Sequence, residues 1–174
     1  MSKFTKRLSG ILALLAVGVG VALAYTHDPE LANYRDTVTL EQAPTGSVTI
    51  EAARKEIDST SDVVLTVRIG ARDVSQWWQA DSASFFASEA TEGSHYNAGE
   101  GHDPTSCPFC RRKWKVEDSM VLVHLVDADG NQIPVSAPDL LNLKDGDIVV
   151  VRGKASVGED GFLVVNSGEI FLGS

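Results

Sequence analysis

Residues 140–165 read LLNLKDGDIVVVRGKASVGEDGFLVV, and this stretch decides the fold class. Asp145-Gly146 and Asp160-Gly161 are turn signals, because glycine accepts the positive φ that tight turns require. Between them, Ile148 to Lys154 is rich in the β-branched residues that favour strands. The stretch therefore predicts a turn, a strand, a hairpin and a returning strand.

Further strand signals lie on both sides of this stretch. Val63 to Ile69 and Met120 to Val126 are apolar runs of strand length. Asp129-Gly130 predicts a hairpin whose short return, Gln132 to Val135, lies at a sheet edge because Pro134 cannot donate to a ladder. The remaining predicted elements are a short amphipathic helix within Val48 to Ile57, a helical turn at Leu140 to Leu143, and a last strand in two pieces, Phe162 to Val165 and Ile170 to Leu172. Five or six short strands predict a mostly β domain, built as a small antiparallel barrel or sandwich.

The quoted string resembles part of the five-stranded OB barrel, in particular its secreted bacterial forms. The first strand and its turn, VVLTVRIGA from Val63 to Ala71, have the same character. The resemblance covers residues 48–70 and 120–172, and it implies a small antiparallel OB-like barrel over residues 48–174 with a long loop insertion between early strands. OB domains often bind nucleic acids or sugars, although a fold alone does not specify its ligand.

The N-terminus predicts an exported protein. Three basic residues precede a short apolar run from Ile11 to Leu23, and Ala22-Leu23-Ala24 supplies the small residues of a signal-peptidase site. The apolar run is shorter than the roughly 20 residues that span a bilayer. We therefore expect a signal peptide at residues 1–24, a periplasmic or secreted protein with no membrane span after cleavage, and a polar, extended leader at residues 25–47.

The chain that remains after this cleavage is strongly acidic. Residues 1–24 carry three basic residues and no acidic residue, so their removal changes the formal net charge from −9 to −12. Nucleic-acid binding depends on lysine and arginine side chains that neutralise phosphates and release counterions. The charge therefore argues against nucleic acid as a partner and leaves an unidentified protein or small molecule.

One long segment, at about residues 88–118, breaks the strand pattern. Residues 88–113 read SEATEGSHYNAGEGHDPTSCPFCRRK, with few apolar side chains and several glycines. Ordering a residue costs about 1–2 kcal/mol of backbone entropy, which so little apolar surface does not offset. A segment of this composition needs another kind of bond to hold a fixed shape.

The same segment contains a candidate metal site, made of His95, His102, Cys107 and Cys110. The Cys-x2-Cys spacing directs two thiolates toward one ion, and imidazole nitrogens commonly complete a tetrahedral set. Zinc is the metal expected for mixed thiolate and imidazole ligands, and copper(I) would accept the same soft donors. Four protein ligands would make a closed, structural site.

Two alternatives remain for the cysteine pair. Cys107 and Cys110 could instead form an incidental disulfide or stay as free thiols. The string from Asp103 to Cys110, followed by basic residues and Trp114, also resembles the active-site stretch of periplasmic thioredoxin-like oxidoreductases. That resemblance implies thiol–disulfide exchange with Cys107 as the attacking and Cys110 as the resolving thiol. In this chain the motif follows a loop rather than a strand, and no βαβ frame surrounds it.

Three further features carry weaker functional signals. The basic cluster Arg111, Arg112, Lys113 and Trp114 is either a solvated run or a patch that docks an anion or a partner. Residues 76–87 predict a strand or ribbon, and its Trp77, Trp78 and Phe85 form either packing contacts or an aromatic face for a ligand. His124, within an apolar strand, is interpreted as a hydrogen-bonded core or rim histidine. Because no catalytic motif with supporting context is present, the sequence favours a binding module over an enzyme.

Overall fold

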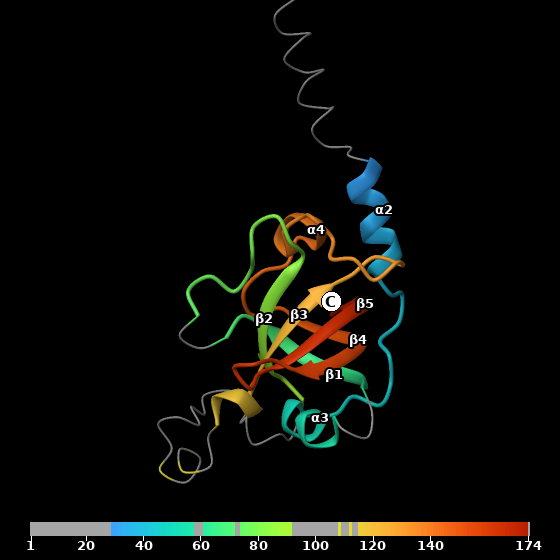
Figure 1. Cartoon of the computed structure of the whole chain (residues 1–174). Helices are drawn as coiled ribbons and strands as arrows, with labels where there is room; N and C mark the ends of the chain where they lie inside the picture. The colour runs from blue at the N-terminus through green and yellow to red at the C-terminus, as the bar shows by residue number, and fades with distance from the viewer. Residues whose placement is uncertain are drawn as a thin grey trace, which may run out of the picture. The chain divides into compact units, whose positions relative to one another are not determined.

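A computed structural model describes residues 29–57, 61–71, 74–91, 108, 112 and 115–173 of the chain (Figure 1). The chain divides into two compact units, residues 1–33 and 34–174. All the strands that the structure describes belong to the second unit. Within the described ranges, no helix combines the length and the apolar character that crossing a bilayer would require. The predicted signal peptide lies outside the described residues.

Five strands close into one barrel in the order β1-β2-β3-β5-β4 (Figure 1). Their bounds are Asp62–Ile69 (β1), Ser84–Glu89 (β2), Met120–Leu125 (β3), Ile148–Val157 (β4) and Leu163–Leu172 (β5). The mostly β class is confirmed, and the strand order is consistent with the OB-like barrel that the sequence predicts. The barrel is mixed rather than purely antiparallel, because β3 and β5 pair in parallel. A parallel pair requires a long connection, which the chain between Leu125 and Leu163 supplies.

The alternation of side chains along each strand builds the core. In β1, Val63, Leu65, Val67 and Ile69 are buried, and the residues between them are more exposed. The same period of two buries alternate residues of the other strands, among them Phe85, Val123, Val151 and Val165. The interior is therefore a closed apolar core, and the outward positions are free to carry function.

A β-bulge interrupts the pairing of β4 with β5. The register shifts between Arg152 and Gly153, so that Gly168 has no partner across the ladder. The hydroxyl of Ser167 lies 2.9 Å from the carbonyl oxygen of Arg152 and 2.7 Å from that of Glu169, and this hydroxyl replaces bonds that the bulge removes. The last strand was predicted in two pieces, but the bulge allows it to continue as one.

Two short helices lie at opposite ends of the barrel in Figure 1. Helix α3 spans Ile50–Glu56, and the side chain of Thr49 accepts a hydrogen bond from the backbone N–H of Ala52 at 3.1 Å. Its buried residues, Ile50 and Ala53, confirm the predicted amphipathic helix. Helix α4 spans Ala137–Leu141, with Ser136 as its N-cap. It confirms the helical turn expected in this region, although the helix begins three residues and ends two residues earlier than predicted.

The segment predicted as an extended leader is partly helical. Helix α2 spans Pro29–Val38, with proline at its first position and Glu30 in its first turn. Both features favour a helix start, although polar residues without an apolar period give no helical signal in the sequence. After the helix, the backbone N–H of Leu40 bonds to the carbonyl oxygen of Ile170 at 2.8 Å. Within the second unit, this segment therefore adds to the barrel wall.

The predicted hairpin after β3 is present as a turn, but without a return strand. Gly130 has φ +84°, as expected for its position in a tight turn. The carboxylate of Asp127 accepts bonds from the backbone N–H groups of Asn131 and Asp129, each at 2.9 Å, and these bonds lower its pKa. Only one bridge follows, between Val126 and Gln132. Pro134, which has no N–H, does not extend the pairing.

Candidate functional site

The four candidate metal ligands, His95, His102, Cys107 and Cys110, lie outside the described residues. Among the residues that the structure does describe, no group of three or more His, Cys, Asp or Glu side chains could hold a metal ion. The structure does describe both ends of the segment between β2 and β3, which the sequence predicts as an insertion and which we call the insertion below. Strand β2 ends at Glu89, and the 3-10 helix η1, Val116–Asp118, leads into β3.

A buried carboxylate fixes the first end of the insertion. Glu89 is only 4% exposed, and its two oxygens accept separate backbone bonds. One oxygen bonds to the N–H of Ile50 at 2.7 Å, and the other bonds to the N–H of Thr91 at 2.7 Å. Ile50 is the first residue of α3, so the negative charge also lies at the positive end of a helix. Glu89 thereby joins the end of β2 to α3.

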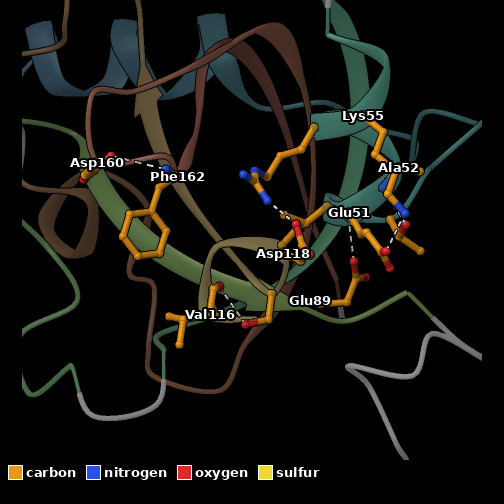
Figure 2. Close-up of polar contacts among 12 residues, drawn as sticks. Glu51, Ala52, Lys55, Glu89, Val116, Asp118, Asp160 and Phe162 are labelled. Atoms are coloured by element: carbon orange, nitrogen blue, oxygen red, sulfur yellow. Dashed lines mark hydrogen bonds and ion pairs between the residues drawn. The ribbon is translucent and has the colours of Figure 1, made fainter. Parts of the chain in front are cut away.

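The same helix holds the second end of the insertion. Asp118, with a side chain 10% exposed, forms an ion pair with Arg54 of α3. The backbone N–H of Glu89 bonds to the carbonyl oxygen of Ser119 at 2.9 Å, which joins the two ends directly. In Figure 2 the carboxylates of Glu89 and Asp118 both face the helix that carries Glu51 and Lys55. We call this arrangement of Ile50, Arg54, Glu89, Asp118 and Ser119 the neck of the insertion.

Two ion pairs that α3 residues form with other described residues differ in strength. Arg54 and Asp118 are largely buried, so removing either partner leaves a charge that water cannot fully solvate, at a cost of about 3–5 kcal/mol. Lys55 and Glu51 form an exposed i,i+4 pair at 2.6 Å, and exposed pairs of this kind contribute little. The neck therefore depends on Arg54, and Lys55 provides a matched control on the same helix.

The basic cluster is described at one position only. Arg112 is exposed. The other members, Arg111, Lys113 and Trp114, lie outside the described residues, so the cluster stays a prediction.

The predicted aromatic residues do not share one face. Phe85 is 1% exposed and lies in the barrel core, because the alternation along β2 directs it inward. Trp77 and Trp78 are partly exposed and lie beside β2, where the N–H of Phe86 bonds to the carbonyl oxygen of Trp77 at 2.6 Å. Phe86, Leu122 and Val164 occupy aligned, partly exposed outward positions on β2, β3 and β5. This apolar row was not predicted from the sequence. The alternation of inward and outward residues from Ser84 to Glu89 nevertheless indicates that Phe86 points outward.

His124 is a hydrogen-bonded rim histidine, as the sequence predicted. Its Nδ1 lies 2.6 Å from the hydroxyl of Ser84, which lies 2.7 Å from the hydroxyl of Ser82. Both serines are buried, and burial also lowers the pKa of His124 below its ordinary value of 6.5. The neutral imidazole is therefore the form that the folded barrel favours.

The lowered pKa of His124 predicts a loss of stability in acid. The unfolded chain binds a proton at this imidazole more readily than the folded chain does. The free energy of unfolding should fall as the pH drops below about 6.5 and through the lower folded-state pKa. In His124→Asn, whose side-chain oxygen still accepts a bond from Ser84, this part of the decline should disappear. Urea unfolding of both proteins between about pH 7 and pH 5 checks the difference, and parallel curves would contradict it.

A hollow of about 460 Å³ lies on the outer face of β1, β4 and β5, and both charged and apolar side chains line it. Lys154 pairs with Asp62 at 2.8 Å and Arg152 pairs with Glu169, so the charges that line the hollow are matched within the protein. Gly153 and Gly168 leave part of its lining without side chains. The sequence did not indicate this feature, because it depends on the bulge and on pairing between distant strands.

Comparison with known proteins adds no assignment: no protein family model matches the chain, and no curated protein matches it significantly.

Proposed function

We propose that this protein is an exported, OB-like binding module whose insertion is held in shape by a structural zinc ion at His95, His102, Cys107 and Cys110. The observation that supports this most directly is the neck. The barrel fixes both ends of the insertion with buried carboxylates, whereas the sequence between them has too little apolar surface to order itself. A coordinate bond supplies the missing cross-link.

The neck also favours metal binding on entropic grounds. The free energy of closing a loop rises with the number of residues between its ends. With the ends already joined by the bond from Glu89 to Ser119, the ligands need to close only the shorter loops between one another. Once bound, zinc would keep both thiols as thiolates and would leave no open position for a substrate.

The surface for a partner would be the outward row of Phe86, Leu122 and Val164, flanked by Trp77 and Trp78. Partly exposed aromatic and aliphatic side chains on a rigid sheet are suited to a small molecule or an apolar patch of a protein. The acidic charge of the chain is consistent with either class and disfavours nucleic acid.

Elemental analysis and thiol titration of the purified mature chain test the zinc proposal. We expect about one zinc per chain, with both thiols unreactive until a chelator removes the metal. Cys107→Ser should weaken zinc binding by more than about 100-fold, because a directly bound ligand is lost. His124→Asn, which changes a barrel histidine, should retain the metal.

Two other results would each replace this proposal. Metal-free protein that catalyses thiol–disulfide exchange, with turnover abolished by Cys107→Ser, would identify the oxidoreductase that the Cys-Pro-Phe-Cys pair resembles. A metal-free protein with inert or disulfide-bonded cysteines would leave the barrel as a binding module without a metal.

A further inference from the structure

We propose that the hollow on the outer face of β1, β4 and β5 binds a small zwitterion, namely a short peptide with free amino and carboxyl ends. The volume of the hollow, about 460 Å³, falls within the range of small-molecule sites, which is about 300–1,000 Å³. Residues of the barrel strands and of the residue that follows β3 line it. The site is therefore independent of the zinc site proposed for the insertion.

The charged side chains of the hollow are arranged about its central strand. Arg152 and Lys154 are two residues apart on β4, so they lie on the same face of the sheet. Their carboxylate partners lie on the two neighbouring strands, Asp62 on β1 and Glu169 on β5. The Nζ of Lys154 lies 2.8 Å and 3.0 Å from the two carboxylate oxygens of Asp62. Two positive charges in the middle are thus flanked by one negative charge on each side.

Both ion pairs are exposed enough to exchange partners. The side chains of Lys154 and Asp62 are 67% and 73% exposed. Those of Arg152 and Glu169 are 52% and 34% exposed. Exposed ion pairs contribute little to stability, because water already solvates both charges. A ligand group of the same charge can therefore replace one partner without a large penalty.

A ligand with both charges matches this arrangement better than a ligand with one. A carboxylate placed between Arg152 and Lys154 would pair with two cations, and it would release a carboxylate that those cations hold. An ammonium group on the same ligand would then pair with Asp62 or Glu169, so that every charge keeps a partner. An anion or a cation alone would leave one side chain of the hollow unpaired.

The spacing of the strands favours a peptide over a free amino acid. Neighbouring strands lie about 4.8 Å apart, which sets the separation between the cations of β4 and the carboxylate on either side. The charged groups of a free amino acid share one carbon atom, whereas a dipeptide separates them by a peptide unit that spans about 3.8 Å between Cα atoms. Val64 and Val126 supply apolar lining for a small side chain, and Asn166 supplies an amide for the peptide group.

Gly168 provides a way to block the hollow without altering its charges. This glycine lines the hollow, and a Cβ at its position would find no atom within 4 Å. A larger side chain there would occupy open space rather than displace the barrel. Gly168→Leu should therefore reduce the room for a ligand and leave Arg152, Lys154 and their partners in place.

Titration of the isotope-labelled protein with L-alanyl-L-alanine, followed by amide NMR shifts, tests the proposal. We expect saturable shifts at Gly153 and Gly168 with a Kd of about 1 mM or lower, and no shift at Gly146, in the turn before β4. Acetylation of the amino end or amidation of the carboxyl end removes one charge of the probe, and each should weaken binding by about tenfold or more. Free alanine should also bind about tenfold more weakly.

Three variants test the residues of the site. Gly168→Leu should weaken binding of the dipeptide by more than about tenfold, with urea unfolding as the check that the barrel is intact. Lys154→Met should weaken it by about tenfold, and it serves if the leucine variant does not fold. Lys55→Met removes an exposed ion pair on α3, away from the lining of the hollow, and should change the affinity by less than about twofold.

Four results would contradict the proposal. The first is the absence of saturable shifts at about ten times the expected Kd. The second is binding of both capped probes as tight as that of the free dipeptide, because the site would then recognise neither charge. Binding of alanine as tight as that of the dipeptide would make the ligand an amino acid and overturn the peptide assignment. Shifts confined to the outward row of Phe86, Leu122 and Val164 would place the peptide on that surface instead of in the hollow.

Discussion

Gly153→Ala is expected to lower the free energy of unfolding by about 3 kcal/mol or more, because the bulge leaves no room for a methyl group. A Cβ at this position would lie 2.3 Å from the backbone oxygen of Asn166 and 2.8 Å from the Cα of Ser167. Both neighbours are backbone atoms of the paired strand, so relief requires β4 and β5 to separate. Urea unfolding monitored by circular dichroism measures the change.

Gly168→Ala is the matched control for this prediction. Gly168 belongs to the same bulge, but a Cβ there would have no atom within 4 Å. We expect a change of less than about 1 kcal/mol, with stabilisation if the unfolded chain loses freedom. Equal effects of the two substitutions would show that backbone crowding is not what selects glycine at position 153.

Phe85→Ala is expected to cost about 3–5 kcal/mol, the usual range for removing a buried aromatic ring. Phe85 is among the largest fully buried side chains of the described residues. Its loss would leave a cavity in the barrel interior, and it would remove a large part of the 5–15 kcal/mol that is typical of a whole domain. Thermal and urea unfolding both report this loss.

Phe86→Ala separates core packing from surface function. Phe86 is the next residue along β2 and points outward, where it is partly exposed. Its substitution should destabilise the barrel by much less than that of Phe85, by about 1 kcal/mol. If the outward row binds a partner, Phe86→Ala should weaken that binding while the fold stays intact. A larger loss of stability at Phe86 than at Phe85 would contradict the assignment of the two faces.

The strands were predictable because their signals are local. Val63 to Ile69 alternates in burial as its sequence suggests, and the glycine turns around β4 occur where the sequence places them. The parallel pairing of β3 with β5 was not predictable, because a strand sequence does not encode which edge it will join. The bulge was also not predictable, since it arises from the pairing of one strand with another and not from a local sequence signal.

The neck was not predicted from the sequence, for a similar reason. Arg54 and Asp118 are 64 positions apart, and Ile50 and Glu89 are 39 apart, so no local spacing connects them. One signal was available: Glu89 is a lone carboxylate at the end of an apolar strand, where a charge needs a partner. Which partner it would find depended on the packing of α3, which periodicity alone does not give.

Strand β1 shares three residue pairs with β2 and seven with β4. Strand β1 lies early in the chain, but most of its hydrogen-bonding partners are synthesised late, because β4 begins only at Ile148. While the chain is being synthesised, β1 lacks most of its pairing partners until residues 148–157 emerge. A chain truncated before Ile148 would expose that strand to pairing with other molecules, and aggregation rather than a smaller barrel is its expected fate.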